Sequence, residues 1–178
     1  MIIDKDITRV VITGPESTGK TELCARLSKY FNTCFVPEFA REYVENLNRS
    51  YTYDDVEFIA REQIILANEQ SRKARRILFY DTFLMLTKVW FDVVYRKHPS
   101  WLENAIEENE VDFYLLCNTD LKWIPDPVRE NGGEAREKLF ELYKNELDNR
   151  EIPYAIVSGH GEARFINALG WIEKKIEK

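Results

Sequence analysis

The sequence has no apolar run of membrane-spanning length, and residues 1–6 lack the apolar core of a signal peptide. Its three cysteines, Cys24, Cys34 and Cys117, are odd in number and show no CxxC spacing. A disulfide framework or a zinc site would need a different pattern, so we expect buried or half-buried thiols in a reducing compartment. These absences together predict a cytoplasmic protein that is not bound to a membrane.

An excess of basic residues is also missing. Lys and Arg number 25 against 31 Asp and Glu, which gives a formal net charge of -6 at pH 7. Proteins bind nucleic acids largely by neutralising phosphates with Lys and Arg, so nucleic acid is not expected as a main partner. The densest basic run, residues 72–76, is expected to close a helix, where the helix dipole favours positive charge. A nucleic-acid patch is the alternative for this run.

The length of 178 residues and the 44% of hydrophobic residues suit one domain with a real core, residues 1–178. Strands are expected at residues 8–13, 33–36, 77–80, 113–117 and 154–157. Helices are expected at residues 22–31, 38–48, 56–76 (after a capping box at 52–55), 83–95 and around 101–108. A further helix is expected to follow residue 136 and end at 147, and the last helix to begin at about 162. The alternation predicts an α/β fold with a five-stranded parallel sheet flanked by helices in three layers. A segment rich in Pro, Gly, Asp and Arg, at about 120–136 between strands four and five, is expected to form a lid.

Residues 14–21, GPESTGKT, match the pattern G-x-x-x-x-G-K-[ST], with a β-branched strand before them and a helical spacing of apolar residues after them. The glycines allow backbone N–H groups to turn inward around an anion at the N-terminus of that helix. Lys20 is expected to reach the β and γ phosphates of a nucleotide, and the Thr21 hydroxyl to bind Mg²⁺. An accidental glycine-rich turn is the alternative, but both flanking elements favour a P-loop kinase fold. The expected nucleotide-binding residues of this loop are Gly14, Glu16, Ser17, Thr18, Gly19, Lys20 and Thr21.

Acidic residues follow two of the expected strands, at the sheet edge where ligands gather in open α/β folds. Asp81 closes an apolar strand as a Walker B acid does, and its carboxylate is expected to bind Mg²⁺ directly or through water. The alternative for Asp81 is an N-cap of the helix that starts near Phe83. Glu38 follows the second strand and is expected to face the γ-phosphate as the general base for an acceptor hydroxyl. A plain first-turn helix acid is the alternative for Glu38.

Two further absences narrow the chemistry. A mechanical ATPase usually carries a glutamate directly after the Walker B aspartate to activate water, but Asp81 is followed by Thr82. Water activation is therefore poorly provided for. A GTPase usually carries Asn-Lys-x-Asp after its fourth strand, whereas residues 118–121 read NTDL here, so guanine specificity is not expected.

Four blocks of the sequence resemble one known family. They are GPESTGKTEL at residues 14–23, VPEFAREYVE at 36–45, FYDTFLMLTKVW at 79–90 and YLLCNTDLKWIPDPVRE at 114–130. Together they resemble the ribosylnicotinamide kinase domain of NadR proteins, a family that includes stand-alone AAA-type ATPase/kinase relatives. The likeness spans nearly the whole chain and is more specific than the phosphate loop alone. It implies that the protein uses ATP and Mg²⁺ to phosphorylate the 5′-hydroxyl of nicotinamide riboside, which gives the NAD precursor nicotinamide mononucleotide.

The resemblance also implies roles for residues outside the phosphate loop. Glu38 and Arg41 match the acidic and basic members of the second block, and both are expected on the substrate side. Asp81 matches the Walker B acid. Trp90 matches a substrate-side aromatic residue, with core packing as the alternative.

Within the expected lid, Arg129 matches a lid arginine that lies near Trp123. The resemblance implies that Arg129, together with Arg136, closes over the transferring phosphoryl group and binds the nucleotide. Ordinary surface charges are the alternative for these arginines. Trp123 is expected to contact the substrate, with lid packing as the alternative.

Two departures from the family pattern limit what the resemblance implies. Many relatives have a second acid two residues after the Walker B aspartate, where this chain has Phe83. Larger NadR proteins also carry an adenylyltransferase domain with a His-x-Gly-His-like motif, and often a helix-turn-helix. Residues 159–161 read GHG and lack the second His, so neither adenylylation nor direct DNA repression is expected.

Two other functions stay open at this point. A P-loop fold does not choose its acceptor, so the protein could phosphorylate another nucleoside or a small alcohol. It could also be a nucleotide-gated ATPase or regulatory binding module in which the lid acts as a switch. A small-molecule substrate is expected as the partner, and no sequence feature indicates an oligomeric state.

Overall fold

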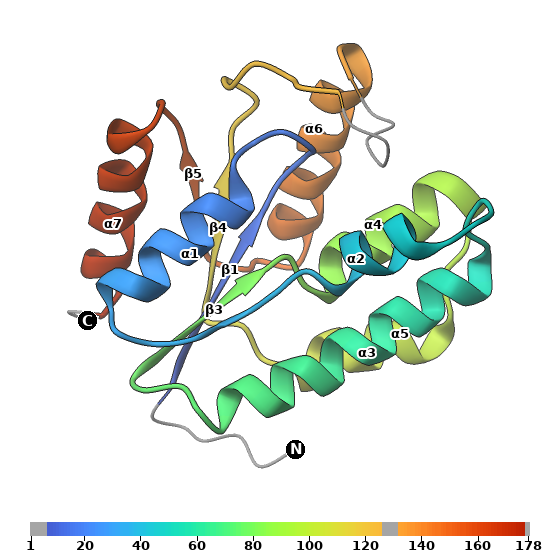
Figure 1. The fold of residues 1–178 in the computed structure, drawn as a ribbon, viewed down its shortest axis with the longest axis horizontal. Coiled ribbons are helices and arrows are strands. Elements are labelled where there is room, and N and C mark those ends of the chain that lie inside the picture. The colour runs from blue at the N-terminus through green and yellow to red at the C-terminus, as the bar shows by residue number, and fades with distance from the viewer. Residues whose placement is uncertain (1–6, 126–131, 177–178) are drawn as a thin grey trace.

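A computed structural model of the protein describes residues 7–125 and 132–176. Within them the chain forms a five-stranded sheet in the order β2-β3-β1-β4-β5, and all neighbouring strands are parallel (Figure 1). The strands are β1 (Thr8–Thr13), β2 (Phe35–Val36), β3 (Ile77–Asp81), β4 (Phe113–Cys117) and β5 (Tyr154–Val157). This topology confirms the parallel α/β fold predicted from the alternation of helices and strands.

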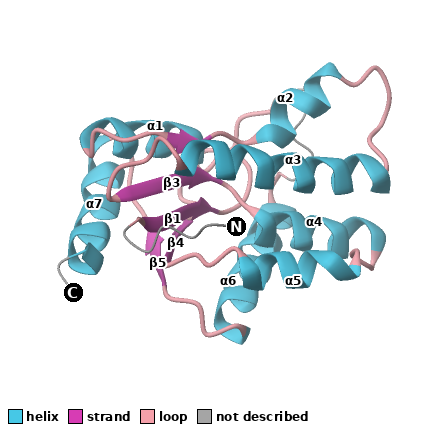
Figure 2. Cartoon of the chain, turned by 90° about the horizontal axis from the view of Figure 1, so that it is seen from below, coloured by secondary structure: helices cyan, strands magenta, loops and turns pink. Residues whose placement is uncertain are grey.

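Helices cover both faces of the sheet, which gives the predicted three layers (Figure 2). On one face α1 (Lys20–Tyr30) and α7 (Glu162–Ile176) pack side by side. The opposite face carries α3 (Tyr53–Ser71), α4 (Leu84–Tyr95), α5 (Ser100–Glu108) and α6 (Glu134–Asn149), and the short α2 (Phe39–Asn46) packs on α3. In the described part of the chain, no helix is both long and apolar enough to cross a bilayer.

Alternate side chains of the strands supply two separate hydrophobic cores. Val10 and Ile12 of β1 belong to the core beneath α1 and α7, whereas Val11 between them belongs to the core beneath the other helices. All three side chains are fully buried. Because helices cover both faces of the sheet, its strands are mostly apolar on both faces and do not alternate regularly with polar residues.

α3 begins with the expected capping box. The Thr52 side chain accepts a hydrogen bond from the Asp55 backbone N–H, and the Asp55 carboxylate accepts one from the Thr52 N–H. The prediction that this helix runs through the basic residues to 76 is wrong, because α3 ends at Ser71. Lys, Arg and Ala favour helix, but the chain must turn here into β3, and the Arg75 N–H bonds to the Thr33 hydroxyl instead.

Two other boundaries differ from the sequence prediction. β2 is shorter than residues 33–36, since only Phe35 and Val36 pair with β3. The Thr33 side chain instead donates a hydrogen bond to the Ile77 carbonyl at 2.8 Å. α1 begins at Lys20, two residues earlier than predicted, so the helix N-terminus lies inside the phosphate-loop motif.

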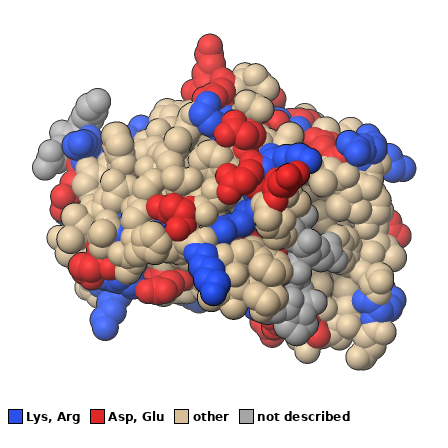
Figure 3. All heavy atoms as spheres, turned by 90° about the horizontal axis from the view of Figure 1, so that it is seen from above, with Lys and Arg blue, Asp and Glu red and all other residues tan. Residues whose placement is uncertain are grey.

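The carboxyl ends of the parallel strands meet at one edge of the sheet, where open α/β folds bind their ligands. Figure 3 looks onto this end of the molecule and shows acidic and basic side chains interspersed over it. The electrostatic potential over this face therefore has no single dominant sign, and attraction of an anion depends on individual charged side chains in a pocket.

Candidate active site

Two glycines shape the phosphate loop between β1 and α1. Gly14 has a φ of 136°, and a Cβ atom there would lie 2.7 Å from the Cys117 carbonyl oxygen, so the loop needs glycine at this position. Gly19, with a φ of 75°, is the N-cap of α1, and no side chain among the described residues caps this helix. The N–H groups of its first turn are therefore left for an anion.

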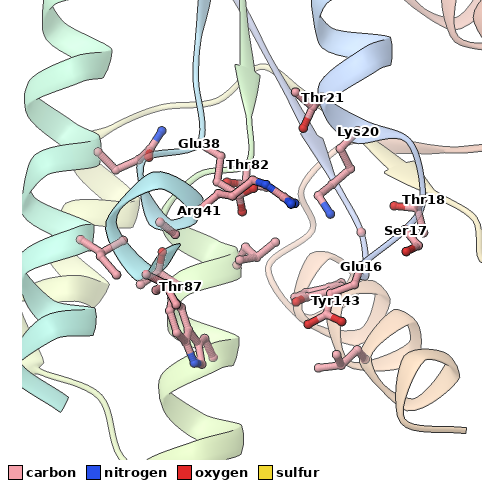
Figure 4. A pocket seen from close by; sticks show the side chains of 18 of the residues that line it. Glu16, Ser17, Thr18, Lys20, Thr21, Glu38, Arg41, Thr82, Thr87 and Tyr143 are labelled. Carbon is pink, nitrogen blue, oxygen red and sulfur yellow. The ribbon is translucent and has the colours of Figure 1, made fainter. Parts of the chain in front are cut away.

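Side chains of the loop also hold its shape from within. The Thr18 hydroxyl donates a hydrogen bond to the Pro15 carbonyl at 2.8 Å, and the Lys20 ammonium donates one to the same carbonyl at 2.9 Å. Figure 4 shows Lys20 reaching from the start of α1 into the space that the loop encloses. The cation is thus already held beside the expected phosphate position.

A pocket of about 420 Å³ opens in front of the loop, within the usual size range of small-molecule sites. The predicted site residues that line it are Gly14, Glu16, Ser17, Thr18, Gly19, Lys20, Thr21, Glu38, Arg41 and Trp90. Asp81, Trp123 and Arg136 lie outside this lining, as the described residues define it. The predicted lid arginine, Arg129, falls outside the described residues. The structure therefore brings the loop and the proposed substrate side together in one pocket.

Glu38 occupies the N-cap position of α2, just after β2, and its side chain accepts no capping hydrogen bond from the described residues. Its side chain is half-buried. Burial raises the pKa of the Glu38 carboxyl above its usual value; the charges of Lys20 and Arg41 oppose this rise, and the charge of Asp81 adds to it. Glu38 and Arg41 lie across the pocket from Lys20 (Figure 4). A carboxylate of raised basicity facing the phosphate loop suits a general base.

Asp81 closes β3 and is only 1% exposed. The N-cap alternative for Asp81 does not hold, because α4 begins at Leu84 with Phe83 as its N-cap. Burial raises the pKa of the Asp81 carboxyl, while a hydrogen bond from the Thr21 hydroxyl lowers it. Within the described residues the Asp81 Oδ1 atom is buried without a hydrogen-bond partner. This unpaired carboxylate oxygen and the nearby hydroxyl are hard oxygen donors, so Asp81 and Thr21 fit a Mg²⁺ ion that arrives with a nucleotide.

Apolar and aromatic side chains form the part of the pocket next to α4. The rings of Tyr51 and Trp90 meet edge to face, with centroids 5.0 Å apart and planes at 75°. Val44, Val93 and Val94 line the pocket beside them. Such a surface suits the flat ring of a base, which gains from contact with apolar and aromatic groups.

Among the pocket residues that sequence reasoning missed, four carry a hydroxyl group: Tyr51, Thr82, Thr87 and Tyr143. Thr82 has a φ of 65°, which is strained for a β-branched residue, and its N–H donates to the Ile12 carbonyl at 3.0 Å. Its position next to Asp81 was the one signal in the sequence that could have indicated it. Thr87 lies in the block at residues 79–90 but no role was expected for it, and Tyr51 and Tyr143 lie in none of the four blocks. Only the folded chain brings these three side chains to the site.

Phe83, which replaces the second acid of many relatives, is 4% exposed and packs in the core. Its ring lies 4.8 Å from that of Tyr80. Among the described residues it is not part of the pocket lining. Among the described residues, the carboxylates that line the pocket are those of Glu16, Glu22 and Glu38.

Arg136, from the first turn of α6, is 5% exposed and ties the phosphate loop to the chain after β4. Its guanidinium donates to the carbonyls of Glu16 and Ser17, both at 2.9 Å, and of Leu121 at 2.7 Å. The Ser17 hydroxyl also donates to the Ile124 carbonyl and accepts from the Ile124 N–H, both at 3.2 Å. Parts of the predicted lid on either side of residues 126–131 therefore brace the loop. Arg136 should act on a nucleotide through the loop's shape.

We expect Arg136→Met to raise the KM for ATP by roughly tenfold to a hundredfold, with a smaller effect on kcat. The substitution keeps the aliphatic stem but leaves three backbone carbonyls without their charged donor, and a hydrogen bond to a charged group contributes about 1.5–3 kcal/mol. Initial rates at varied ATP measure this effect. Arg26→Met is the control, because Arg26 pairs with Glu162 away from the loop tip and should leave the KM unchanged. An unchanged KM in Arg136→Met would make Arg136 a residue of fold stability only.

The turn after β4 is engaged with the loop after β5. The Asn118 amide donates to the Ser158 hydroxyl at 3.0 Å. The Asp120 carboxylate accepts from the Gly159 N–H at 2.6 Å and from Arg164 at 2.7 Å. In a GTPase, side chains at this turn would hydrogen-bond to the guanine base. Here the side chains of Asn118 and Asp120 form hydrogen bonds within the protein instead.

An ion-pair cluster fixes α4, α5 and α6 relative to one another. Lys88 of α4 is 8% exposed and lies 2.9 Å from Asp92, 3.2 Å from Glu146 of α6 and 3.7 Å from Glu103 of α5. Removing one partner of such a buried cluster is strongly destabilising, because it leaves an uncompensated charge. The cluster therefore holds in place the two helices that carry Trp90 and the α6 residues of the pocket.

The sequence model of a family described as an AAA domain, AAA_28, matches residues 9–164. The chain belongs to this family. The match includes the phosphate loop, all of β1 except Thr8, the strands β2 to β5, and the helices that surround the pocket.

Two curated relatives are NadR proteins. The trifunctional NAD biosynthesis/regulator protein NadR of Escherichia coli (strain K12) is 26% identical over 170 residues, which cover 92% of this chain and 41% of that protein. Its counterpart from Salmonella typhimurium (strain LT2) is 27% identical over 140 residues, which cover 76% of this chain and 34% of that protein. The chain spans less than half the length of these relatives. The matches confirm the resemblance to NadR proteins that the four sequence blocks indicated.

Solved structures show the same fold. A NadR protein in complex with NR superposes with a TM-score of 0.79 at 23% identity, covering 97% of this chain and 52% of that one. A NadR protein in complex with NAD and AMP-PNP gives a TM-score of 0.75 at 22% identity, covering 97% and 50%. Deoxyadenosine kinase from M. mycoides, with products bound, gives 0.65 at 14% identity, covering 94% and 100%. The fold is therefore that of P-loop kinases.

Proposed function

We propose that the protein transfers the γ-phosphoryl group of ATP to the 5′-hydroxyl of a nucleoside, and that this nucleoside is nicotinamide riboside. The observation that carries the proposal is a single pocket in which a phosphate loop, an opposing carboxylate and an aromatic surface follow one another. In this arrangement the nucleotide phosphates occupy the loop, the acceptor hydroxyl meets Glu38, and the base lies against Tyr51 and Trp90.

The relatives support both halves of this proposal. One NadR structure contains NR, and another contains NAD and AMP-PNP, a nucleoside triphosphate analogue. Deoxyadenosine kinase, of the same fold, was solved with nucleotides. Identities of 14–23% support the fold, and the acceptor of this chain therefore needs a direct test.

The residues of the pocket suit a loose phosphoryl transfer, in which the protein positions groups and stabilises charge. Glu38 would orient the acceptor hydroxyl and take its proton as the oxygen attacks the γ-phosphorus and the bond to the β-phosphate oxygen breaks. Lys20 and the free N–H groups of α1 would hold the β and γ oxygens. When bound, Mg²⁺ would neutralise these oxygens, with Thr21 and Asp81 as its protein ligands. Arg129 stays predicted as a further cation near the transferring group.

The test is acceptor-dependent consumption of ATP. With Mg²⁺ and ATP, the purified protein should convert nicotinamide riboside to its 5′-monophosphate with a kcat/KM at least about tenfold above that for uridine, cytidine or deoxynucleosides. Mass spectrometry should show a product equal to acceptor plus one phosphate, in a one-to-one ratio with ADP.

Two outcomes would change the assignment in different ways. Preference for another nucleoside would keep the kinase chemistry and replace the acceptor. Release of ADP at a rate indifferent to every nucleoside would instead favour a nucleotide-gated ATPase or binding module. In the absence of an acceptor we expect slow hydrolysis, because Thr82 stands where a mechanical ATPase carries its water-activating glutamate.

A further inference from the structure

Tyr143 of α6 is a buried residue of the pocket that the mechanism above does not use. Its side chain is 5% exposed, and it lines the pocket together with Leu139, one helical turn earlier. Residues four apart share one face of a helix, so both side chains point from α6 into the same space. The Tyr143 ring belongs to the core with Phe140 and Leu147, while its remaining exposed surface faces the pocket.

The Tyr143 hydroxyl has no hydrogen-bond partner in the part of the chain that the structure describes. Two tyrosine hydroxyls elsewhere are paired: that of Tyr43 donates to Asp55 and that of Tyr154 donates to Asp148, both at 2.8 Å. Among the described residues the Tyr143 hydroxyl is not one of the fully buried polar atoms that lack a partner, so it keeps surface that is open to the pocket. An unpaired hydroxyl that opens onto a ligand pocket therefore points to a partner on the ligand.

The surrounding charges indicate what kind of group that partner is. Burial raises the pKa of the Tyr143 phenol, and the charges of Glu38 and Glu16 raise it further, so the phenol stays protonated and can donate. Figure 4 shows Tyr143 beside Glu16, with Glu38, Thr82 and Arg41 on the opposite side of the pocket. These two negative charges disfavour a further anion next to the Tyr143 hydroxyl, whereas a neutral hydroxyl group of a ligand can accept its hydrogen bond.

The position of Tyr143 agrees with the sugar of a bound nucleoside. With its 5′-hydroxyl at Glu38 and its base against Tyr51 and Trp90, a nucleoside must place its sugar between these ends. We propose that the Tyr143 hydroxyl donates a hydrogen bond to the 2′- or 3′-hydroxyl of the acceptor's sugar, and thereby makes Tyr143 a specificity-determining residue that selects ribosides. This inference rests on the proposed function, because it assumes a nucleoside acceptor in this pocket.

The experiment compares Tyr143→Phe with the unmodified protein on three acceptors. They are nicotinamide riboside and its 2′-deoxy and 3′-deoxy analogues. The variant should raise the KM for the riboside about tenfold, the usual cost of one buried hydrogen bond to substrate, and leave kcat and the KM for ATP unchanged. The analogue that lacks the contacted hydroxyl should bind the variant and the unmodified protein equally well, since both then lack the same hydrogen bond.

Tyr154→Phe is the matched control. It also removes a phenol hydroxyl, but one that bonds to Asp148 outside the pocket, so all three KM values should stay as in the unmodified protein. Thermal unfolding of both variants shows whether the fold is intact. If Tyr143 had only a structural role, its loss would change the KM for the riboside and for the deoxyribosides alike, and the ratio of the two KM values would stay the same.

Three results would overturn the inference. The first is an unchanged KM for the riboside in Tyr143→Phe. The second is an equal rise of KM for the riboside and both analogues, which would make the hydroxyl a structural group. The third is a rise in the KM for ATP alone, which would place the hydroxyl on the phosphates. All three leave the kinase activity of the unmodified protein in place, whereas an unmodified protein that phosphorylates no nucleoside overturns the proposed function and this inference together.

Discussion

Lys20→Ala should lower phosphoryl transfer by roughly a hundredfold to a thousandfold, to the limit of detection, while the fold stays intact. In the structure the Lys20 ammonium is held in the pocket by the Pro15 carbonyl, at 2.9 Å. It is therefore placed to meet the charge that develops on the β and γ oxygens during transfer. Removing one such preorganised donor typically costs about 2.7–4 kcal/mol in the transition state.

Initial rates of ADP formation with a saturating acceptor measure this loss, and thermal unfolding checks the fold. Lys29→Ala is the control, because Lys29 is exposed in the last turn of the same helix and should keep normal turnover. Normal turnover in Lys20→Ala would remove the phosphate loop from the chemistry and with it the proposed function.

The sequence alone predicted those site residues whose position follows from a short motif or from the end of a strand. The phosphate loop is a contiguous motif, and its shape follows from Gly14 and Gly19. Glu38 and Asp81 are far apart in the sequence, yet both follow a strand. Since carboxyl ends of parallel strands meet at one edge, their shared location could be predicted once the sheet was predicted to be parallel. The order β2-β3-β1-β4-β5 then brings both strands to the same side of β1.

The features that sequence reasoning missed depend on contacts between distant segments. The contacts of Arg136 with Glu16 and Ser17 span about 120 residues, and no local pattern reports them. Tyr143 has the spacing of an ordinary core residue, and what distinguishes it is its place in the pocket with a hydroxyl that has no partner among the described residues. The helix end at Ser71 was missed for a related reason. Helix propensity favours continuation through the basic run, but the connection into β3 overrides it.

The three-dimensional contacts also changed the expected role of Arg136. Sequence resemblance implied that it would close over the transferring phosphoryl group with Arg129. The structure shows its guanidinium bonded to backbone carbonyls at the tip of the phosphate loop. A direct contact with nucleotide therefore stays a prediction, and the variant Arg136→Met separates the two roles through the KM for ATP.

Glu38→Gln should lower kcat by roughly a hundredfold or more and leave the KM for ATP little changed. Glutamine keeps the size of glutamate and can still orient the acceptor hydroxyl, but it has no basic oxygen to take the proton, and a positioned general base contributes about 10²–10⁴-fold. The raised pKa of Glu38 is a property of a better base, whereas an acid that only starts a helix would not need to face Lys20 across a pocket. Steady-state rates at saturating acceptor and varied ATP separate the two parameters.

Two further variants decide whether this loss belongs to Glu38 as a base. Glu42→Gln is the matched control, because Glu42 is exposed in the first turn of the same helix and should keep normal kcat. Asp81→Asn should instead raise the Mg²⁺ concentration needed for half-maximal rate, since it weakens an oxygen ligand of the ion. If Glu38→Gln phosphorylates as fast as the unmodified protein, Glu38 is only the acid at the start of α2. Asp81, buried beside Thr21 with one carboxylate oxygen that has no partner among the described residues, then becomes the better candidate for the base.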